Sequence, residues 1–150
     1  MIKKLCLTFG AAAFLLSASA SQQGKTEEKE TRTLKVKLAY NGSGTVDEKH
    51  KIIVFLFDSP DFAQGSVMPS DMRAAKAKDE TVTFSGFTAS PVFVVCVYDP
   101  TGSYEGMSPP PSGSSMGMYS KTPGQPEPVK VEPGKTVEIE LAFDDSNKMP

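Results

Sequence analysis

Two segments of the chain alternate between apolar and polar residues, which is typical of β-strands with one face in water. Residues 34–40 place Leu, Val, Leu and Tyr at every second position, with lysines between the first three of them. Residues 137–143 repeat the pattern with Val, Ile, Leu and Phe, and glutamates stand between the first three. Because successive side chains of a strand point to opposite faces, both segments are predicted to be strands with one buried face.

Two further segments, 52–57 (IIVFLF) and 91–98 (PVFVVCVY), are apolar at nearly every position. Runs rich in β-branched and aromatic residues predict strands that are covered on both faces. Residues 82–85 form a shorter alternating strand, and Val129 and Val131 mark another. The predicted core comprises apolar residues of these strands: Leu34, Val36, Leu38, Ile52, Val54, Leu56, Val82, Phe84, Phe93, Val95, Val97, Val137, Ile139, Leu141 and Phe143.

Six or seven strands separated by turn signals, without a long helical period, predict a single all-β antiparallel β-sandwich of about seven strands. Residues 70–78 are the one helix candidate, a short surface turn with Ser70 as N-cap and mostly alanine as apolar content. Residues 102–128 are rich in Gly, Ser and Pro and hold three methionines. Proline cannot donate in a central ladder, so this insert is predicted to be a long loop or an edge covering.

The first twenty residues have the pattern of a secretory signal peptide. Lys3 and Lys4 precede an apolar run over residues 5–16, and Ala18-Ser19-Ala20 supplies the small residues of a cleavage site. We expect cleavage near Ala20, a polar disordered tether over residues 21–31, and a folded domain over residues 32–150. The protein is then secreted or periplasmic, with no stable insertion in a membrane.

Composition narrows the class of partner. Without Lys3 and Lys4, 14 basic residues stand against 18 acidic ones, which gives a net charge of about −4. This mild acidity argues against nucleic acid as a partner. Of the two cysteines, Cys6 lies in the signal region and only Cys96 remains, so no internal disulfide is expected.

Four segments together resemble a known family. They are the two-sided strand 52–57, Phe84-Ser85-Gly86-Phe87, the strand ending in Val97-Tyr98-Asp99, and residues 133–137 (PGKTV). This arrangement resembles the transthyretin-like, or carboxypeptidase-regulatory-like, β-sandwich domains of exported bacterial proteins. Such domains usually have proline-glycine before the strand where this chain has residues 88–91 (TASP). The resemblance implies a β-sandwich with a binding or accessory role.

The sequence contains no recognisable catalytic or cofactor-binding motif. The single histidine, His50, lies in a polar stretch and is predicted to be a solvated turn residue. Cys96 lies within an apolar strand, where a buried and unreactive thiol is expected. There is no phosphate-binding glycine loop, zinc-ligand spacing or dinucleotide fingerprint. We therefore expect a protein that is not an enzyme and carries no cofactor.

Two metal sites remain as alternatives. Asp58, Asp99 and Asp144 follow predicted strands, and Ca²⁺ prefers several such oxygen ligands in one place. Turn formation explains the same aspartates more simply. The second site is Cu(I) bound by thioethers of the insert, the candidates being Met107, Met116 and Met118.

The insert itself is the third candidate for function. Tyr104 and Tyr119 flank its proline-rich part, which includes Pro110, and could pack this loop onto the sandwich. Since two predicted strands are apolar on both faces, one outer face must be covered by the insert or by a partner. The sequence thus favours an envelope protein or a glycan as the partner of a loop-covered face, with periplasmic metal binding as the alternative.

Overall fold

The structure is a computed structural model that describes residues 30–150, so the expected signal peptide and most of the tether lie outside the described residues. The described chain forms seven strands and one short helix. The elements are β1 Arg32–Tyr40, β2 Ile52–Phe57, the 3₁₀-helix η1 Pro60–Gln64, β3 Asp71–Ala75, β4 Thr81–Phe87, β5 Phe93–Tyr98, β6 Ser115–Met118 and β7 Thr136–Phe143.

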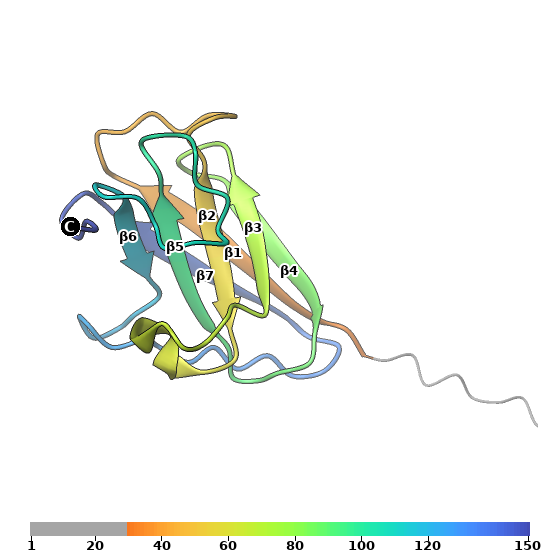
Figure 1. Ribbon diagram of the computed structural model, residues 1–150. Coiled ribbons are helices and arrows are strands. Elements are labelled where there is room, and N and C mark those ends of the chain that lie inside the picture. The colour runs from red at the N-terminus through yellow and green to blue at the C-terminus, as the bar shows by residue number, and fades with distance from the viewer. Residues whose placement is uncertain (1–29) are drawn as a thin grey trace, which may run out of the picture.

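The strands form two stacked sheets, as the sequence predicted for a sandwich. One sheet has three strands in the order β4-β1-β7, and the other has four in the order β3-β2-β5-β6. In Figure 1 the four-stranded sheet lies in front of the three-stranded one. Four of the five pairings are antiparallel, whereas β1 and β7 run parallel, with Leu34 opposite Val137 and Tyr40 opposite Phe143. The alternating strands that the sequence identified first therefore lie side by side.

The core lies between the two sheets and joins every second residue of the paired strands. Antiparallel pairing sets Val54 opposite Cys96 and Leu56 opposite Val94, so these four side chains share the inner face. The inner cluster consists of Leu34, Val36, Leu38, Tyr40, Ile52, Val54, Leu56, Ala75, Val82, Phe84, Val92, Val94, Cys96, Tyr98, Val129, Val131, Ile139, Leu141 and Phe143.

The expected core residues of β5 are buried as predicted, but they do not lie between the two sheets. Phe93, Val95 and Val97 are buried, but they alternate with the inner residues of the strand and so belong to the outer face of the sheet. A strand that is apolar on both faces carries no periodic signal to tell the faces apart, and only its pairing with β2 fixes them. Val137, near the start of β7, is only half-buried and packs at the rim of the core.

Three predictions about local structure were also wrong. Residues 70–78 form no helix, because residues 71–75 pair with β2 and bury Ala75 completely. The insert contains an edge strand, β6, in the proline-free stretch between Pro111 and Pro123. Val129 forms only an isolated bridge with Val92, and no strand runs through Val131. In the first two cases pairing with a neighbouring strand overrode the local preference.

The described chain, residues 30–150, holds no helix with the length and apolar character required to cross a membrane.

Candidate functional site: an apolar groove on the four-stranded sheet

The outer face of the four-stranded sheet carries a second apolar cluster. Ile53, Phe55 and Val97 are buried there, with exposed fractions of 6%, 5% and 2%. They face away from the core because they alternate with the inner residues of β2 and β5. Met116, on β6, packs against them. The outer face of the four-stranded sheet is therefore apolar and largely shielded from solvent.

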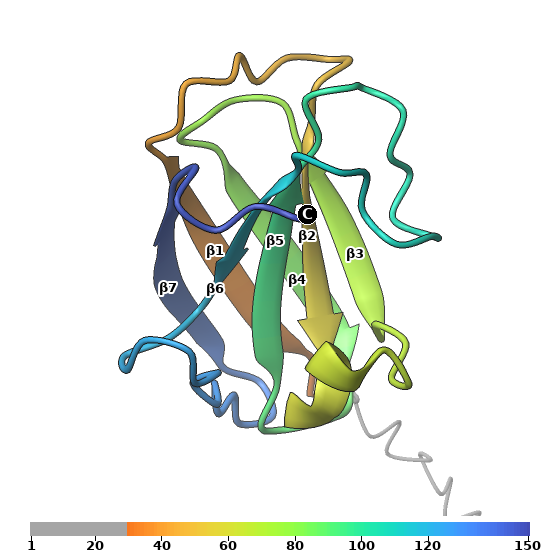
Figure 2. The same ribbon diagram turned by 60° about the vertical axis from the view of Figure 1, so that its left-hand side comes forward.

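Four segments rise around this face and enclose a groove of about 640 Å³. They are the loop 99–114, η1 with residues 65–69, residues 124–126, and the C-terminal residues 147–149. Figures 1 and 2 show the first loop, in teal, and η1 standing out from the sheet on this side. The floor is formed by residues of three strands: Phe55, Phe57, Val95, Val97, Met116 and Met118.

Aromatic contacts hold two of the walls on the floor. Tyr104 lies against Phe55, with ring centroids 6.4 Å apart. Phe62 of η1 stacks on Phe57 at 4.9 Å. Gly106 has a positive φ of 83° and passes close to Phe55, where a side chain would have little room. The loop and η1 are thus anchored on either side of the groove by buried ring area.

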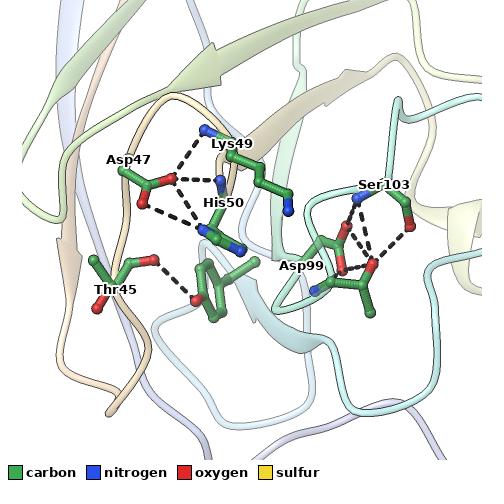
Figure 3. Close-up of polar contacts among 8 residues, drawn as sticks. Thr45, Asp47, Lys49, His50, Asp99 and Ser103 are labelled. Carbon is green, nitrogen blue, oxygen red and sulfur yellow. Dashed lines mark hydrogen bonds and ion pairs between the residues drawn. The ribbon is translucent and has the colours of Figure 1, made fainter.

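The carboxylate of Asp99 fixes the start of the loop. It accepts hydrogen bonds from the backbone N–H groups of Thr101, Ser103 and Tyr104, each at 2.7 Å, and from the Thr101 hydroxyl. Figure 3 shows the contacts that Asp99 makes with Thr101 and Ser103, beside the neighbouring loop, residues 45–50. Burial acts to raise the pKa of Asp99, but these hydrogen bonds outweigh it and lower that pKa below its usual value. The direction of Tyr104 toward the groove follows from this turn.

The C-terminal segment forms another wall by pairing with the edge of the sheet. The backbone N–H of Met116 donates to the carbonyl of Asn147 at 2.8 Å. The N–H of Met149 donates to Ser114 O, and the N–H of Gly113 donates to Met149 O, both at 2.9 Å. Asn147 and Met149 consequently line the groove beside β6.

The groove is uncharged. Among the described residues that line it, within 30–150, no Asp, Glu, Lys, Arg or His occurs, and Tyr104 is the only titratable side chain. Burial, together with the nearby negative charge of Asp99, raises the pKa of Tyr104, so its phenol stays neutral. The electrostatics of this surface therefore favour a neutral, apolar ligand over an ion with hard ligands or a charged metabolite.

Methionines gather at this groove. Met68, Met107, Met116, Met118 and Met149 line it. The remaining methionine of the described residues, Met72, packs against the same apolar cluster from β3. Met68 and Met107 are 69% and 71% exposed and are the two exposed large hydrophobic side chains of the described chain. Met149 was missed by sequence reasoning, because a single apolar residue in a polar tail gives no signal.

The residues of the proposed interaction loop divide between two places. Tyr104 and Pro110 line the groove. Tyr119, by contrast, packs at the edge of the inner core, and its backbone N–H donates to Val94 O at 2.9 Å. The expectation that the flanking tyrosines pack the loop onto the sandwich thus describes both contacts, but only one of the tyrosines faces the groove.

The three aspartates considered for calcium do not come together. Because β2 and β5 are antiparallel, Asp58 lies at one end of the sandwich and Asp99 at the other. The Asp144 carboxylate accepts a hydrogen bond from the backbone N–H of Ser146 at 2.8 Å, as in an ordinary turn. Within residues 30–150 no group of three or more His, Cys, Asp or Glu side chains is placed to hold a metal ion.

His50 and Cys96 lie apart from each other and from the groove. The Nδ1 atom of His50 is 3.0 Å from Asp47 Oδ1, and Asp47 also accepts from two backbone N–H groups of the same loop (Figure 3). Tyr98 closes this loop by donating to Thr45 O at 3.0 Å. Cys96 is fully buried in the inner core, and burial raises the pKa of its thiol far above the usual value.

No protein-family model matches the chain, and neither a curated protein nor a solved structure shows a significant match to it. The groove geometry is therefore the basis for a functional proposal.

Proposed function

We propose that this protein is an exported, non-catalytic binding module that docks an apolar segment of a partner protein in the groove of the four-stranded sheet. The observation that supports it is a 640 Å³ groove lined by apolar residues and five methionines, without a charged side chain. Export is supported by the signal-peptide pattern of the first twenty residues. A transthyretin-like relationship remains a hypothesis that rests on the sequence resemblance alone.

Physical chemistry favours a protein segment over a glycan. Sugar hydroxyl groups need several hydrogen-bonding side chains, and the groove offers Tyr104, Ser108 and Asn147 as its polar side chains. Methionine side chains are flexible and polarizable, so they adapt to different aliphatic and aromatic partners. The two most exposed of them, Met68 and Met107, stand on opposite walls, on the η1 side and in the loop. This arrangement suits an extended or helical segment that inserts apolar side chains between them.

The experiment is peptide display against the protein, followed by affinity measurement of an enriched peptide. We expect enrichment of peptides rich in Leu, Ile, Phe and Met. Met107→Glu places a charge in the groove from an exposed position, so folding should be unchanged while affinity falls at least about tenfold, which needs only 1.4 kcal/mol. Thr83→Glu, on the exposed outer face of the other sheet, is the matched control and should bind like the wild type.

Point substitution is a better test than removal of the insert. Deleting residues 103–127 would remove β6, and with it the cover that Gly117 gives to Cys96 and Phe143 in the core. Absence of any peptide enrichment, or equal affinity of Met107→Glu and wild type, would overturn the proposal. Selective binding on a glycan array that Met107→Glu abolishes would replace the protein segment by a sugar ligand.

A further inference from the structure

Strand β6 presents two thioethers side by side on the groove. Met116 and Met118 are two residues apart on one strand, so their side chains point to the same face. Gly117, between them, faces the core, where an added Cβ would lie 2.6 Å from Phe143 Cβ and 2.8 Å from Cys96 Sγ. The inward position therefore has room only for glycine, and both sulfur-bearing side chains face outward.

A third and a fourth methionine line the same groove as this pair. The C-terminal segment pairs with residues 113–116, with Lys148 opposite Ser115, so Met149 is a diagonal neighbour of Met116. Diagonal neighbours across paired strands are about 7–8 Å apart, within reach of long side chains. Met107 lines the same groove from the loop 99–114, and its high exposure leaves its sulfur free to turn inward.

The chemistry of this cluster selects one kind of ion. Thioethers are soft, neutral ligands that suit Cu(I), whereas Zn²⁺ and Ca²⁺ need imidazole, thiolate or carboxylate ligands. No such group lines the groove, and the Cys96 thiol lies beneath Gly117 on the core side of the sheet. Phe55 and Val97 supply a low-dielectric floor, which gives no competing ligand and limits the access of water.

We propose that the groove binds one Cu(I) ion through the thioethers of Met116 and Met118, with Met107 and Met149 completing the ligand set. Three of these residues were candidates from the sequence, and the pairing of the C-terminal segment with β6 adds the fourth. Copper binding can be tested separately from peptide docking. Leucine can replace methionine as an apolar docking residue, but it cannot ligate a metal.

The test is an anaerobic Cu(I) titration, with ascorbate as reductant, in competition with a chromophoric Cu(I) chelator. Every sample is the full chain carrying Cys6→Ser, so that the buried Cys96 is the one remaining thiol. The starting protein should withdraw one copper ion per chain from the chelator. Met116→Leu with Met118→Leu should withdraw none, while Met72→Leu, outside the groove lining, should behave like the starting protein.

Two further readouts separate this proposal from peptide docking and from misfolding. X-ray absorption at the copper edge should show a shell of sulfur ligands only. Fluorescence of N-phenyl-1-naphthylamine, an uncharged apolar probe, should be equal in the starting protein and the double leucine variant, because leucine keeps the groove apolar. No copper uptake, undiminished uptake by the double variant, or a nitrogen and oxygen shell would overturn the copper site without affecting the docking proposal.

Discussion

Asp145 provides the sharpest test of what holds the sandwich together at the end opposite η1. Its carboxylate accepts hydrogen bonds from the Tyr40 hydroxyl at 2.6 Å, from the Ser43 backbone N–H at 2.9 Å, and from the hydroxyls of Ser43 and Ser115 at 2.8 and 2.7 Å. These partners come from β1, the loop after it and β6, so one side chain joins both sheets. Asp145→Asn replaces one of the two charged acceptor oxygens with a donor.

The expected loss follows from the number and type of these bonds. A hydrogen bond to a charged group contributes about 1.5–3 kcal/mol, and Asn keeps one acceptor, so we expect a net loss of about 2 kcal/mol at pH 7. For a domain of this size that corresponds to a melting temperature lower by roughly 8 °C. A Tyr40→Phe variant should lose less, since it removes one of the four donors and leaves the carboxylate ionised.

The pKa of Asp145 determines how the stability of the fold changes with pH. The Tyr40 hydrogen bond first, then those from Ser43 and Ser115, hold the pKa of Asp145 well below its usual 3.8. The carboxylate therefore stabilises the fold at pH values above 3.8, and this contribution falls as the pH drops below 3.8, where the unfolded chain gains a proton that the folded chain does not. Burial, and after it the hydrogen bond to Asp145, raise the pKa of Tyr40 to about 12.

Thermal unfolding of the wild type, Asp145→Asn, Tyr40→Phe and the double variant at pH 7 and at pH 3 measures these effects. The control is Asp144→Asn, because that neighbouring carboxylate is exposed and accepts its hydrogen bond from Ser146, within its own turn. We expect the gap between the wild type and Asp145→Asn to be smaller at pH 3 than at pH 7. An equal gap at both pH values, or additive effects of the two substitutions, would refute a charged network centred on Asp145.

Two further predictions concern the contact between the sheet edge and the core. Gly117→Ala should lower the free energy of unfolding, measured in denaturant titrations, by about 1–3 kcal/mol. The reason is that its new methyl group would overpack against Cys96. A neutral effect would mean that the edge strand moves freely. In a Cys6→Ser background, Cys96 should resist alkylation by iodoacetamide in the folded protein and react in denaturant, and rapid native labelling would contradict its burial.

The fold class was predictable because periodicity in the chain is strong where one sheet face is wet. β1 and β7 alternate clearly, and the expected core matches their inner residues except that it includes the half-buried Val137 and leaves out Tyr40. Periodicity does not tell the two faces apart where both are covered, so the sequence could not show that Phe93, Val95 and Val97 lie on the outer face of β5. It also fails for β3, whose Asp-Met-Arg-Ala-Ala sequence becomes a strand only through pairing with β2.

The site was predictable in outline only. The excess of apolar residues in 52–57 and 91–98 required a covered outer face, and the sequence offered either the insert after Gly102 or a partner as the cover. The full set of residues that line the groove was not predictable, because η1 and residues 147–149 reach the groove through tertiary contacts and edge pairing. Met149 joins the groove only because the segment that carries it pairs with β6, a strand that sequence analysis had placed within a loop.

The position of β6 links the stability of the sandwich to the chemistry of the groove. Ser115 and Gly117 face inward, the first bonding Asp145 and the second covering Cys96, and this fixes the register of a strand only four residues long. Since side chains alternate, the same two contacts direct Met116 and Met118 outward. Weakening the inward contacts should therefore disorder β6 and its thioether pair before the rest of the fold unfolds. Asp145→Asn should then reduce copper uptake at temperatures where the other six strands remain paired.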